Sequence, residues 1–489
     1  MQTIPFRAVG THDVQLAAQG HPPGWRSPPG GDYDLVVVGG GPGGLVAALT
    51  AAGAGHRVAV VERHLTGGTC VNYGCTPSKA LIACARAAHR AAHLGPTFGY
   101  RLPGPPEVDF AAVMERVRAM RVNSSKFDAV PAVAAAGVDV YLGDARFAAE
   151  DAVEVDGRRL RFRAAVIATG SRAGVPDADG LAEVGFLTNE TVFGLTERPR
   201  RLAVVGAGPL GCELAQAFRH LGCEVDLISA GDRLLPKDDP DASGVIRRRF
   251  EREGIRLHLG AALRRVERTG DAKRLTLDDR RTIDCDELLL GVGRVPNVEG
   301  LGLEAAGVRT TPHGVEVDQH LRTSNRNIYA VGDCCSRYKF THAAMAMGQL
   351  AARNALDGAG RAVSSVAIPW CTYTDPEVAH VGLTPQEADD QGIAIDTHRL
   401  DLTMVERAVI EAQAEGFAAI STRQGTGRIV GATLVSAHAG ETIPLLTAFV
   451  QHELPLEALA EVVHCYPTQA EVLKRIADNY LKAAQAAKV

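Results

Sequence analysis

Residues 34–62, DLVVVGGGPGGLVAALTAAGAGHRVAVVE, read as a buried β-branched strand, a glycine-rich turn, a helix of small residues and a second strand. Gly39, Gly41 and Gly44 occupy the pattern G-x-G-x-x-G between the first strand and the helix. Such glycines permit a tight turn, close approach of a pyrophosphate and close helix–strand packing, while the helix N-terminus faces the anion. The segment therefore predicts a Rossmann-like unit that binds a dinucleotide.

A second segment repeats this order. Residues 202–229, LAVVGAGPLGCELAQAFRHLGCEVDLIS, again give strand, glycine turn, helix and strand, with Gly206, Gly208 and Gly211 in the pattern. One such match is a weak signal, but two matches that each lie between a strand and a helix are a strong one. The chain is therefore expected to be an α/β protein with two dinucleotide-binding domains.

The two units end differently. Glu62 closes the first unit, where a carboxylate can accept hydrogen bonds from the 2′-hydroxyl of an adenosine ribose, so this unit suits FAD. Ser229 has the same spacing from Gly206 as Glu62 has from Gly39, and it carries no charge. The nearest cation beyond it is Arg233. The second unit is therefore undecided between NADH and NADPH, with NADPH slightly favoured because nothing here repels a phosphate.

Three further motifs place glycines after apolar strands: VIATGS (166–171), GVGRVPN (291–297) and NIYAVGD (327–333). The acid in the last motif could bind a ribityl or phosphate-linker hydroxyl. Taken singly, each motif is more often a simple strand-to-turn junction. The residues that they offer as cofactor contacts are Thr169, Gly170, Gly293, Gly332 and Asp333.

The bulk composition excludes several classes of protein. A chain of 489 residues, 46% hydrophobic and 22% charged, predicts an ordinary globular protein of several domains. The net charge of −5 offers no general attraction to nucleic acid or to an anionic membrane. Residues 1–31 lack the apolar core of a secretory signal and are expected to form a flexible arm. No segment approaches the roughly 18 apolar residues of a membrane helix, so we expect a cytoplasmic protein.

Two thiols lie close together in GGTCVNYGCTPSK, residues 67–79. A disulfide between Cys70 and Cys75 would close a short loop and contribute little stability, because the entropy removed from the unfolded chain grows with loop length. A structural zinc site would need about four ligands, and no second CxxC or HxxxH lies nearby. A metal site would therefore need ligands from elsewhere in the chain.

A redox role for this pair has positive support. Thr76 and Pro77 are typical of the cap and first position of a helix, which places Cys75 at a helix N-terminus. The helix dipole and the nearby Lys79 both favour the thiolate form there. With a flavin site just upstream, the pattern favours a catalytic thiol pair.

The motif GGTCVNYGCTPSK resembles the redox-active disulfide motif of the flavin-dependent pyridine nucleotide–disulfide oxidoreductases. This family includes dihydrolipoamide dehydrogenase, glutathione reductase and mercuric reductase, and the resemblance runs from about residue 32 to about residue 480. Four other segments are most similar to a mercuric-reductase-like branch: HPPGW (21–25), YKFTHAA (338–344), IPWCTYTDPEVAHVG (368–382) and YPTQAE (466–471).

The resemblance implies a domain order and a dimer. After the arm, an FAD-binding domain (32–185 and 291–364) is interrupted by an NAD(P)-binding domain (186–290). An α+β dimerisation domain (365–489) follows, and its C-terminal segment completes the active site of the partner subunit. A homodimer with a shared active site is therefore expected.

The resemblance also implies roles. Cys75 would be the charge-transfer thiolate beside the flavin, and Cys70 the interchange thiol that meets the substrate. Lys79 would pair with Glu213 near the reactive edge of the flavin. Electrons would pass from NAD(P)H to FAD, then to the Cys70–Cys75 disulfide, and then to an oxidised substrate.

The segment HCYPTQAE (464–471) departs from the pattern of the disulfide reductases, which have a histidine directly before the proline. Tyr466 holds that place, and Glu471 keeps the place of the glutamate that orients the histidine. Only about one tyrosine in a thousand is ionised at pH 7, so tyrosine is a poor base. Mercuric reductase also has tyrosine here, which fits transient capture of a soft ion by the thiolates of Cys70 and Cys75.

A second departure concerns mercury delivery. Mercuric reductase ends in a cysteine pair that passes the ion inward, whereas this chain ends KAAQAAKV and its last cysteine is Cys465. Cys465 could replace that relay or be a packed small hydrophobe, with the two alternatives evenly balanced. Cys334 and Cys335 are expected to be buried thiols, and His342 a core histidine.

Three functions follow as hypotheses. The first is an NAD(P)H-dependent flavoenzyme that reduces a soft metal ion, Hg(II) first, or a related thiol-reactive electrophile. The second is a reductase of a small disulfide such as lipoamide or glutathione disulfide. The third is a redox-sensing or complex-docking flavoprotein of low turnover.

Overall fold

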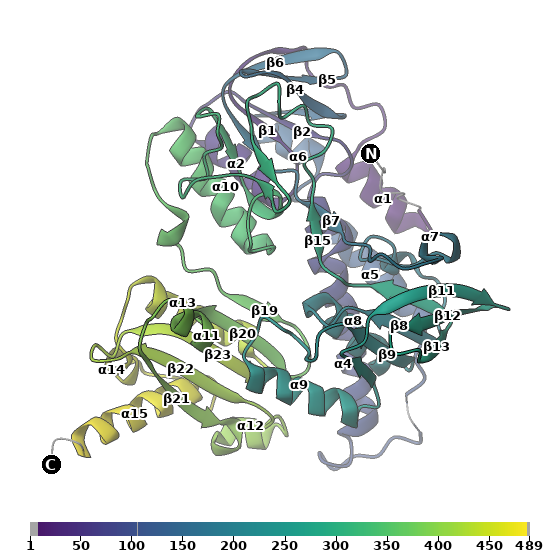
Figure 1. Ribbon diagram of the computed structural model, residues 1–489, viewed down its shortest axis with the longest axis vertical. Coiled ribbons are helices and arrows are strands. Elements are labelled where there is room, and N and C mark those ends of the chain that lie inside the picture. The colour runs from purple at the N-terminus through teal and green to yellow at the C-terminus, as the bar shows by residue number, and fades with distance from the viewer. Residues whose placement is uncertain (1–7, 105, 487–489) are drawn as a thin grey trace.

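The β-branched run of the first glycine motif forms the centre of a seven-stranded sheet in the computed structural model, which describes residues 8–104 and 106–486 (Figure 1). Its strands are β1 (Gly31–Val38), β2 (Val58–Glu62), β3 (Val138–Leu142), β4 (Ala145–Ala149), β5 (Ala152–Val155), β6 (Arg158–Ile167) and β18 (Ile328–Ala330). They pair in the order β3-β2-β1-β6-β5-β4, and β18 adds to the C-terminal half of β6. β1, β2, β3, β6 and β18 are parallel, whereas β4 and β5 form an antiparallel extension.

Helices from distant parts of the sequence pack on this sheet: α2 (Pro42–Gly53), α6 (Val130–Ala135) and α10 (Thr341–Leu356). Three further helices, α3 (Gly68–Tyr73), α4 (Cys75–His93) and α5 (Phe110–Ser125), pack on one another. α2 and α10 lie side by side because small residues line their contact (Figure 1). A Cβ on Gly348 would lie 2.2 Å from the carbonyl oxygen of Gly43, so the two backbones approach as closely as glycine allows. A short hairpin, β16 (Thr310–Thr311) and β17 (Gly314–Val315), completes this part.

The expected flexible arm is replaced, over its described residues, by a packed segment; residues 1–7 lie outside the described residues. Residues 11–20 form helix α1 (Thr11–Gly20), which packs on α5 and buries Leu16. Asp13 forms a buried ion pair with Arg121, with Oδ1 and Nη1 3.1 Å apart. The indole Nε1 of Trp25 donates to the carbonyl of Val140 at 3.0 Å. The prolines and glycines of this segment suggested flexibility, but its side chains bind residues about a hundred positions away in the sequence.

The second glycine motif builds a smaller parallel sheet. Its strands pair in the order β10 (Arg256–Leu259), β9 (Glu224–Ser229), β8 (Arg201–Val205) and β14 (Glu287–Leu290), and its helices are α8 (Pro209–His220) and α9 (Pro240–Arg252). An antiparallel layer is added by β11 (Leu263–Thr269), β12 (Ala272–Leu277) and β13 (Thr282–Cys285). The chain enters through β7 (Ser171–Ala173) and α7 (Leu181–Val184) and leaves through β15 (Arg294–Pro296), which pairs with β7.

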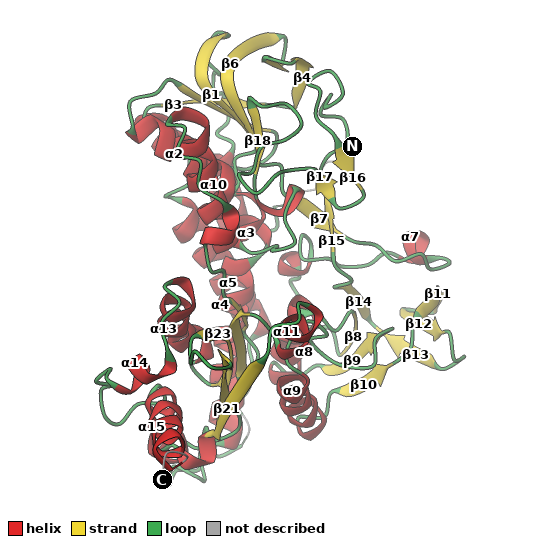
Figure 2. Cartoon of the chain, turned by 60° about the vertical axis from the view of Figure 1, so that its left-hand side comes forward, coloured by secondary structure: helices red, strands yellow, loops and turns green. Residues whose placement is uncertain are grey.

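The C-terminal part is an antiparallel sheet with helices against it (Figure 2). Its strands pair in the order β19 (Trp370–Thr372), β20 (Glu377–Gly382), β23 (Ile429–Ser436), β22 (Phe417–Arg423) and β21 (Ile395–Asp401). Its helices are α11 (Pro385–Asp390), α12 (Glu406–Ile410), α13 (Ala439–Gln451), α14 (Leu456–Ala460) and α15 (Glu471–Ala486). α13 contacts β20 and β23, and α15 contacts β21 and β22.

One hydrophobic cluster crosses all three parts. It includes Leu81 of α4, Phe218 of α8, Phe250 of α9 and Phe417 of β22, all fully buried. The expected fold class, two Rossmann-like domains followed by a C-terminal α+β domain, is confirmed. The domain boundaries inferred from the sequence stay predictions, as does the cytoplasmic location. Among the described residues, no helix combines the length and the apolar character needed to cross a membrane.

Candidate active site

Cys75 is the first residue of α4, and Gly74 is its N-cap. The helix therefore begins one residue before the cap that the sequence predicts at Thr76, because α3 extends to Tyr73 and the chain reverses at Gly74. A Cβ on Gly74 would lie 2.9 Å from the carbonyl oxygen of Thr69, so a side chain has no room at this reversal. The expectation that Cys75 lies at a helix N-terminus agrees with this geometry, although the cap is a different residue.

The two thiols have opposite proton affinities. The thiol of Cys70 forms a hydrogen bond with Cys75, and Cys75 Sγ lies 3.3 Å from Thr341 Oγ1. The bond from Cys70 outweighs burial and, together with Thr341 and the charge of Lys79, lowers the pKa of Cys75 to about 6. The same hydrogen bond and burial raise the pKa of Cys70. Because the two groups titrate as a pair, the reduced site holds one thiolate and one thiol at neutral pH.

Thr341 is a site residue that the sequence did not reveal. It is the first residue of α10, 266 residues from Cys75 along the chain. The sequence pattern of its segment, YKFTHAA, indicates a family resemblance but no role for Thr341. No local pattern connects the two positions, because the contact depends on how α10 packs beside α2.

An ion pair joins Lys79, one turn into α4, to Glu213 of α8. Lys79 Nζ lies 2.7 Å from Glu213 Oε2, and the carboxylate is 4% exposed. The other carboxylate oxygen accepts the backbone N–H of Tyr373 at 2.9 Å, and the Tyr373 ring lies beneath the ammonium group at 4.3 Å. All three parts of the chain meet at this pair, which places a fixed positive charge close to the Cys75 thiolate.

The first glycine turn is too tight for any other residue. Gly39 has φ +112°, and a Cβ there would lie 2.4 Å from the carbonyl oxygen of Ala168. A Cβ on Gly44 would lie 1.9 Å from the carbonyl oxygen of Gly39. The start of α3 covers the turn, because a Cβ on Gly68 would lie 2.7 Å from the Cα of Gly41. These contacts define a narrow, covered cradle at the N-terminus of α2, where backbone N–H groups face an anion.

Glu62 lies at the edge of this cradle. Its Oε2 accepts the backbone N–H of Gly40 at 2.7 Å, and its Oε1 accepts that of His64 at 2.8 Å. Burial raises the pKa of this carboxyl in spite of these bonds. Each carboxylate oxygen retains a lone pair that can accept a ribose hydroxyl. The cradle and this carboxylate together fit the ADP half of FAD.

The three strand-end motifs converge beside the first sheet. Asp333 accepts a 2.5 Å hydrogen bond from Ser171 and lies 3.3 Å from Arg294 Nε. Thr169 Oγ1 donates to the carbonyl of Asn297 at 2.6 Å. The proposed cofactor contacts from these motifs therefore lie in one region, and their glycines have positive φ: Gly170, Gly293 and Gly332.

The second glycine turn has the same backbone but an open surface. Gly206 has φ +117°, and a Cβ on Gly211 would lie 1.8 Å from its carbonyl oxygen. A Cβ on Gly208 would meet no atom within 4 Å. At the end of β9, Ser229 Oγ accepts the backbone N–H of Gly231 at 3.1 Å, and the half-buried Arg233 donates to the carbonyl of Pro236. This geometry fits an exchangeable nicotinamide nucleotide.

The C-terminal candidates gather at a separate place in the chain. Tyr466 is 67% exposed and donates a hydrogen bond to Glu406. Glu471 Oε1 pairs with Arg475 Nε at 2.8 Å, and its Oε2 is buried without a hydrogen-bond partner. Cys465 is exposed in the single chain, and its two alternative roles stay predictions. Helix α15, which follows this segment, lies well below α3 in Figure 2.

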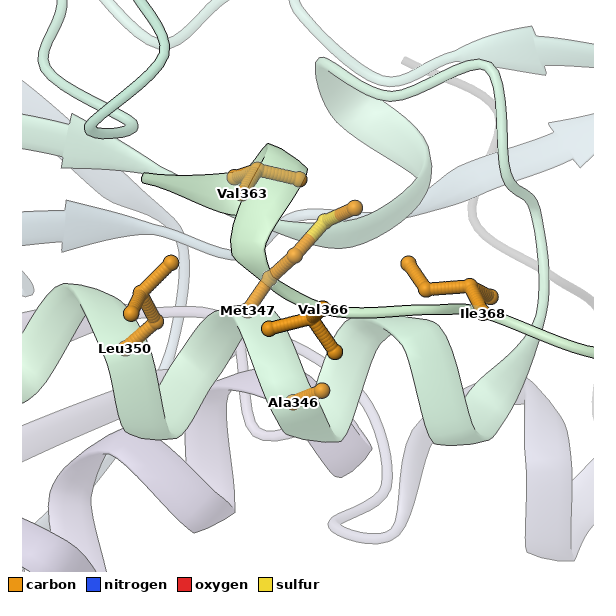
Figure 3. A pocket seen from close by; sticks show the side chains of 6 residues that line it. All are labelled: Ala346, Met347, Leu350, Val363, Val366 and Ile368. Atoms are coloured by element: carbon orange, nitrogen blue, oxygen red, sulfur yellow. The ribbon is translucent and has the colours of Figure 1, made fainter. Parts of the chain in front are cut away.

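Other candidates are structural. Cys334 is fully buried and donates to the carbonyls of Ile167 and Val331, as expected of a packed thiol. The expectation that His342 is a core histidine is wrong: its side chain is exposed, because it lies on the outer side of α10, and a ring nitrogen bonds to the carbonyl of Pro369 at 2.6 Å. An apolar crevice beside α10 has no room for a water molecule and offers no substrate site (Figure 3); it is lined by Ala346, Met347, Leu350, Val363, Val366 and Ile368.

A covered dinucleotide cradle, an open one and an activated thiol pair beside the first are the working parts of an enzyme that moves electrons between nicotinamide, flavin and thiols. The chain belongs to the pyridine nucleotide-disulphide oxidoreductase family, whose model matches residues 33–348. The model of the family's dimerisation domain matches residues 368–477. Members of the family use FAD and NAD(P)H.

The relatives carry more than one name. A mercuric reductase of Streptomyces lividans is 38% identical, over 92% of this chain and 96% of the relative. A dihydrolipoyl dehydrogenase of Chlamydia muridarum is 35% identical, over 90% and 95%. Among solved structures, LpdA from Mycobacterium tuberculosis has a TM-score of 0.83 at 29% identity, covering 91% of this chain and 99% of its own. A Cu(II) complex of the HOCl-induced flavoprotein disulfide reductase RclA from Escherichia coli has a TM-score of 0.81 at 25% identity, covering 92% and 99%.

Proposed function

We propose that this protein reduces a soft metal ion, Hg(II) first, or a related thiol-reactive electrophile, with electrons from NAD(P)H. The observation that carries the proposal is Tyr466 at the position where disulfide reductases of the family use a histidine. Its hydrogen bond to Glu406 raises the pKa of the phenol, so the side chain is an even poorer base than free tyrosine. The similarity to the mercuric reductase of Streptomyces lividans supports the same substrate class.

The residues of the chain divide the work. FAD, held at Gly39, Gly44 and Glu62, supplies two-electron transfer when it is bound. Cys75 is the thiolate held ready by Thr341 and Lys79, and Cys70 gives up its proton when the ion binds, because a coordinating thiol is deprotonated. Two thiolates suit a soft ion.

The reaction balances without an external base. One hydride from NAD(P)H carries two electrons, Hg(II) becomes Hg(0), and NAD(P)⁺ and one proton are released. A reduced disulfide must take up two protons, so its reduction needs an acid at the site. The phenol of Tyr466, which donates a hydrogen bond to Glu406, can act as an acid but is a poor base at neutral pH.

We propose that the active site is completed in a homodimer, in which Tyr466 of the partner subunit reaches Cys70. The family's dimerisation domain supports this assembly. Large apolar side chains are also exposed on that domain, as expected of a surface that a second subunit covers: Met404, Val409, Ile410 and Val463. Sedimentation should give a dimer, and a fully active monomer would contradict this assembly.

A second candidate, reduction of a small disulfide, is favoured by one observation. Glu471 keeps the position of the orienting glutamate, and its buried Oε2 lacks a partner, which leaves an acceptor ready to hold an acid or base. The dihydrolipoyl dehydrogenase relatives support this alternative. A low-turnover redox sensor is the third candidate.

Substrate challenge of the reduced enzyme separates the three candidates. The purified protein is reduced anaerobically with NADPH or NADH and then mixed with Hg(II), lipoamide or glutathione disulfide, with Cys70→Ser as the control. Hg(II) should reoxidise the flavin and consume one NAD(P)H per ion. Reoxidation by a disulfide but not by Hg(II) would overturn the proposal, and normal reduction without any reoxidation would identify a sensor.

Two variants test the C-terminal departures. Tyr466→His should raise disulfide reductase activity, up to the roughly 10²–10⁴-fold effect of a positioned acid/base, while metal-dependent NADPH oxidation stays flat or falls. Cys465→Ser should slow turnover of Hg(II) presented as a bis-thiol complex, and Cys84→Ser controls for loss of a thiol elsewhere. If neither Tyr466→His nor Cys465→Ser has its effect, these two positions do not select the substrate.

A further inference from the structure

The loop of residues 230–239 joins β9 to α9 and lies against the second glycine turn. Within that turn, the carbonyl of Ala207 accepts the backbone N–H of Leu235 at 2.8 Å. Leu234 and Leu235 are fully buried, so this part of the loop is packed against the domain. The loop also carries Arg233, the nearest cation beyond the second strand of the unit. It therefore forms a rim of the open cradle that fits a nicotinamide nucleotide.

The backbone of this loop is strained at Leu235. Its φ is +46°, in the left-handed region that residues other than glycine rarely enter. Such a conformation persists only when the surrounding contacts hold it. The carbonyl of Leu235 accepts the backbone N–H of Asp238 at 2.9 Å, so the strained residue depends on where Asp238 is held.

Asp238 bonds to a different part of the chain. Its side chain is 5% exposed, and its Oδ1 accepts the indole N–H of Trp370 at 2.7 Å. Trp370 lies in β19 at the edge of the C-terminal sheet, 132 residues further along the sequence. Burial raises the pKa of Asp238 to about 6, and the bond from Trp370 opposes this rise because it stabilises the charged form. The indole thus supports a carboxylate whose burial is otherwise costly.

The indole is itself held in one orientation. Its ring is nearly parallel to that of Phe340, with the centroids 6.5 Å apart, and its centroid lies 4.5 Å from that of His380. His380 is 1% exposed, and its Nδ1 lies 2.9 Å from Thr433 Oγ1. The support of the loop is therefore anchored on β20 and β23, the strands that carry His380 and Thr433.

We propose that Trp370 is a positioning residue for the nicotinamide nucleotide: from the C-terminal sheet it holds residues 230–239, through Asp238, in the conformation that forms the rim of the second cradle. A dinucleotide with its pyrophosphate at the N-terminus of α8 places its adenosine beside the end of β9 and this loop. A loop that is already in place loses less conformational freedom when the nucleotide binds, so binding is tighter. The proposal concerns nucleotide binding alone and does not depend on which electron acceptor the thiols reduce.

Titration of the oxidised holoenzyme with NADP⁺ and with NAD⁺, without an electron acceptor, tests this role. Trp370→Phe keeps the aromatic packing and removes the N–H donor, so the dissociation constant of the more tightly bound nucleotide should rise about tenfold. FAD content should not change. Trp25→Phe removes the other indole of the chain and is the matched control, which should bind the nucleotide normally. An unchanged dissociation constant in Trp370→Phe would overturn the proposal.

Variants of Asp238 test whether the two residues act together. Asp238→Asn keeps an oxygen that accepts the indole N–H, so its affinity should stay within about threefold of the unaltered protein. Asp238→Ala should lose about as much affinity as Trp370→Phe. The double variant should lose no more than either single variant, because both changes remove the same bond. Additive losses would show that Trp370 does not act through Asp238.

Trypsin cleavage after Arg233 reports on the loop in the absence of nucleotide. The bond lies beside the buried Leu234, so the unaltered holoenzyme should be cut slowly there, whereas Trp370→Phe should be cut about tenfold faster and Trp25→Phe at the unaltered rate. Mass spectrometry of the fragment that ends at Arg233 gives the rate. If Trp370→Phe does not fold, Asp238→Ala and Asp238→Asn are compared in its place. Equal cleavage rates in these two variants would overturn the proposal.

Discussion

The two dinucleotide units share one backbone and differ in what covers it. Gly39 and Gly206 have φ of +112° and +117°, and the added Cβ at Gly44 or Gly211 would lie 1.9 or 1.8 Å from the carbonyl oxygen of the first glycine. The turn itself is therefore the same, because the same steric limits act on the same spacing. Any difference in how the two turns bind their ligands must come from the residues around them.

The first cradle is covered and the second is open. α3 approaches Gly41 and α10 packs on α2, where a Cβ on Gly43 would lie 3.0 Å from the carbonyl oxygen of Ala344. Glu62 adds a carboxylate held by two backbone bonds, whereas Ser229 adds none. A covered site holds its ligand as part of the core, and an open one allows exchange. We therefore expect the first cradle to keep its flavin and the second to exchange a nicotinamide nucleotide.

The largest effect should come from alanine in the two tight turns. Gly44→Ala should cost about 1–3 kcal/mol or more through overpacking, so that FAD content after gel filtration falls about tenfold to a hundredfold. Gly211→Ala should retain FAD and instead raise the KM for NAD(P)H. Gly53→Ala, in open space on α2, is the matched control. Equal loss of FAD in both tight-turn variants would break the distinction between the cradles.

A smaller effect, on the preference for NADH over NADPH, should come from giving the second unit a carboxylate like that of Glu62. Ser229→Glu supplies the carboxylate that Glu62 supplies in the first unit, and a hydrogen bond to a charged group contributes about 1.5–3 kcal/mol. The ratio of kcat/KM for NADH to that for NADPH should therefore rise about tenfold or more. Ser229→Gln controls for size without charge. An unchanged ratio would show that specificity lies elsewhere in the open cradle.

The smallest effect concerns Thr341. This residue begins α10, which packs on α2 beside the first cradle, and its hydroxyl contacts Cys75. Alkylation of reduced enzyme by iodoacetamide should have a midpoint near pH 6, because the thiolate of Cys75 is present above its lowered pKa. Thr341→Val removes one hydrogen bond to the thiolate and should raise this midpoint by about half a unit. Thr447→Val, on α13, is a control for the substitution. A midpoint near 9 in the unaltered enzyme would contradict the assigned electrostatics.

Local sequence patterns predicted the strands and helices of the two nucleotide units. They did not predict where α4 begins or how the N-terminal segment packs. The βαβ units follow from strand periodicity and glycine spacing, which act over about 30 residues. The cap of α4 was misplaced by two residues, because the end of α3 at Gly74 sets where the next helix begins. The N-terminal segment was expected to be flexible because its anchors, Arg121 and Val140, are distant in sequence.

The sequence by itself determined the two nucleotide units and the closely spaced thiol pair, since each depends on residue types at short, regular spacings. The departure at Tyr466 was implied by the family resemblance. Only the tertiary structure brought Thr341 to Cys75 and stacked His89 on His220. The ion pair of Lys79 with Glu213, which the family resemblance implied, is present. These contacts join segments more than a hundred residues apart. Which side chains meet there depends on how helices of different domains pack, and no local rule of spacing contains that information.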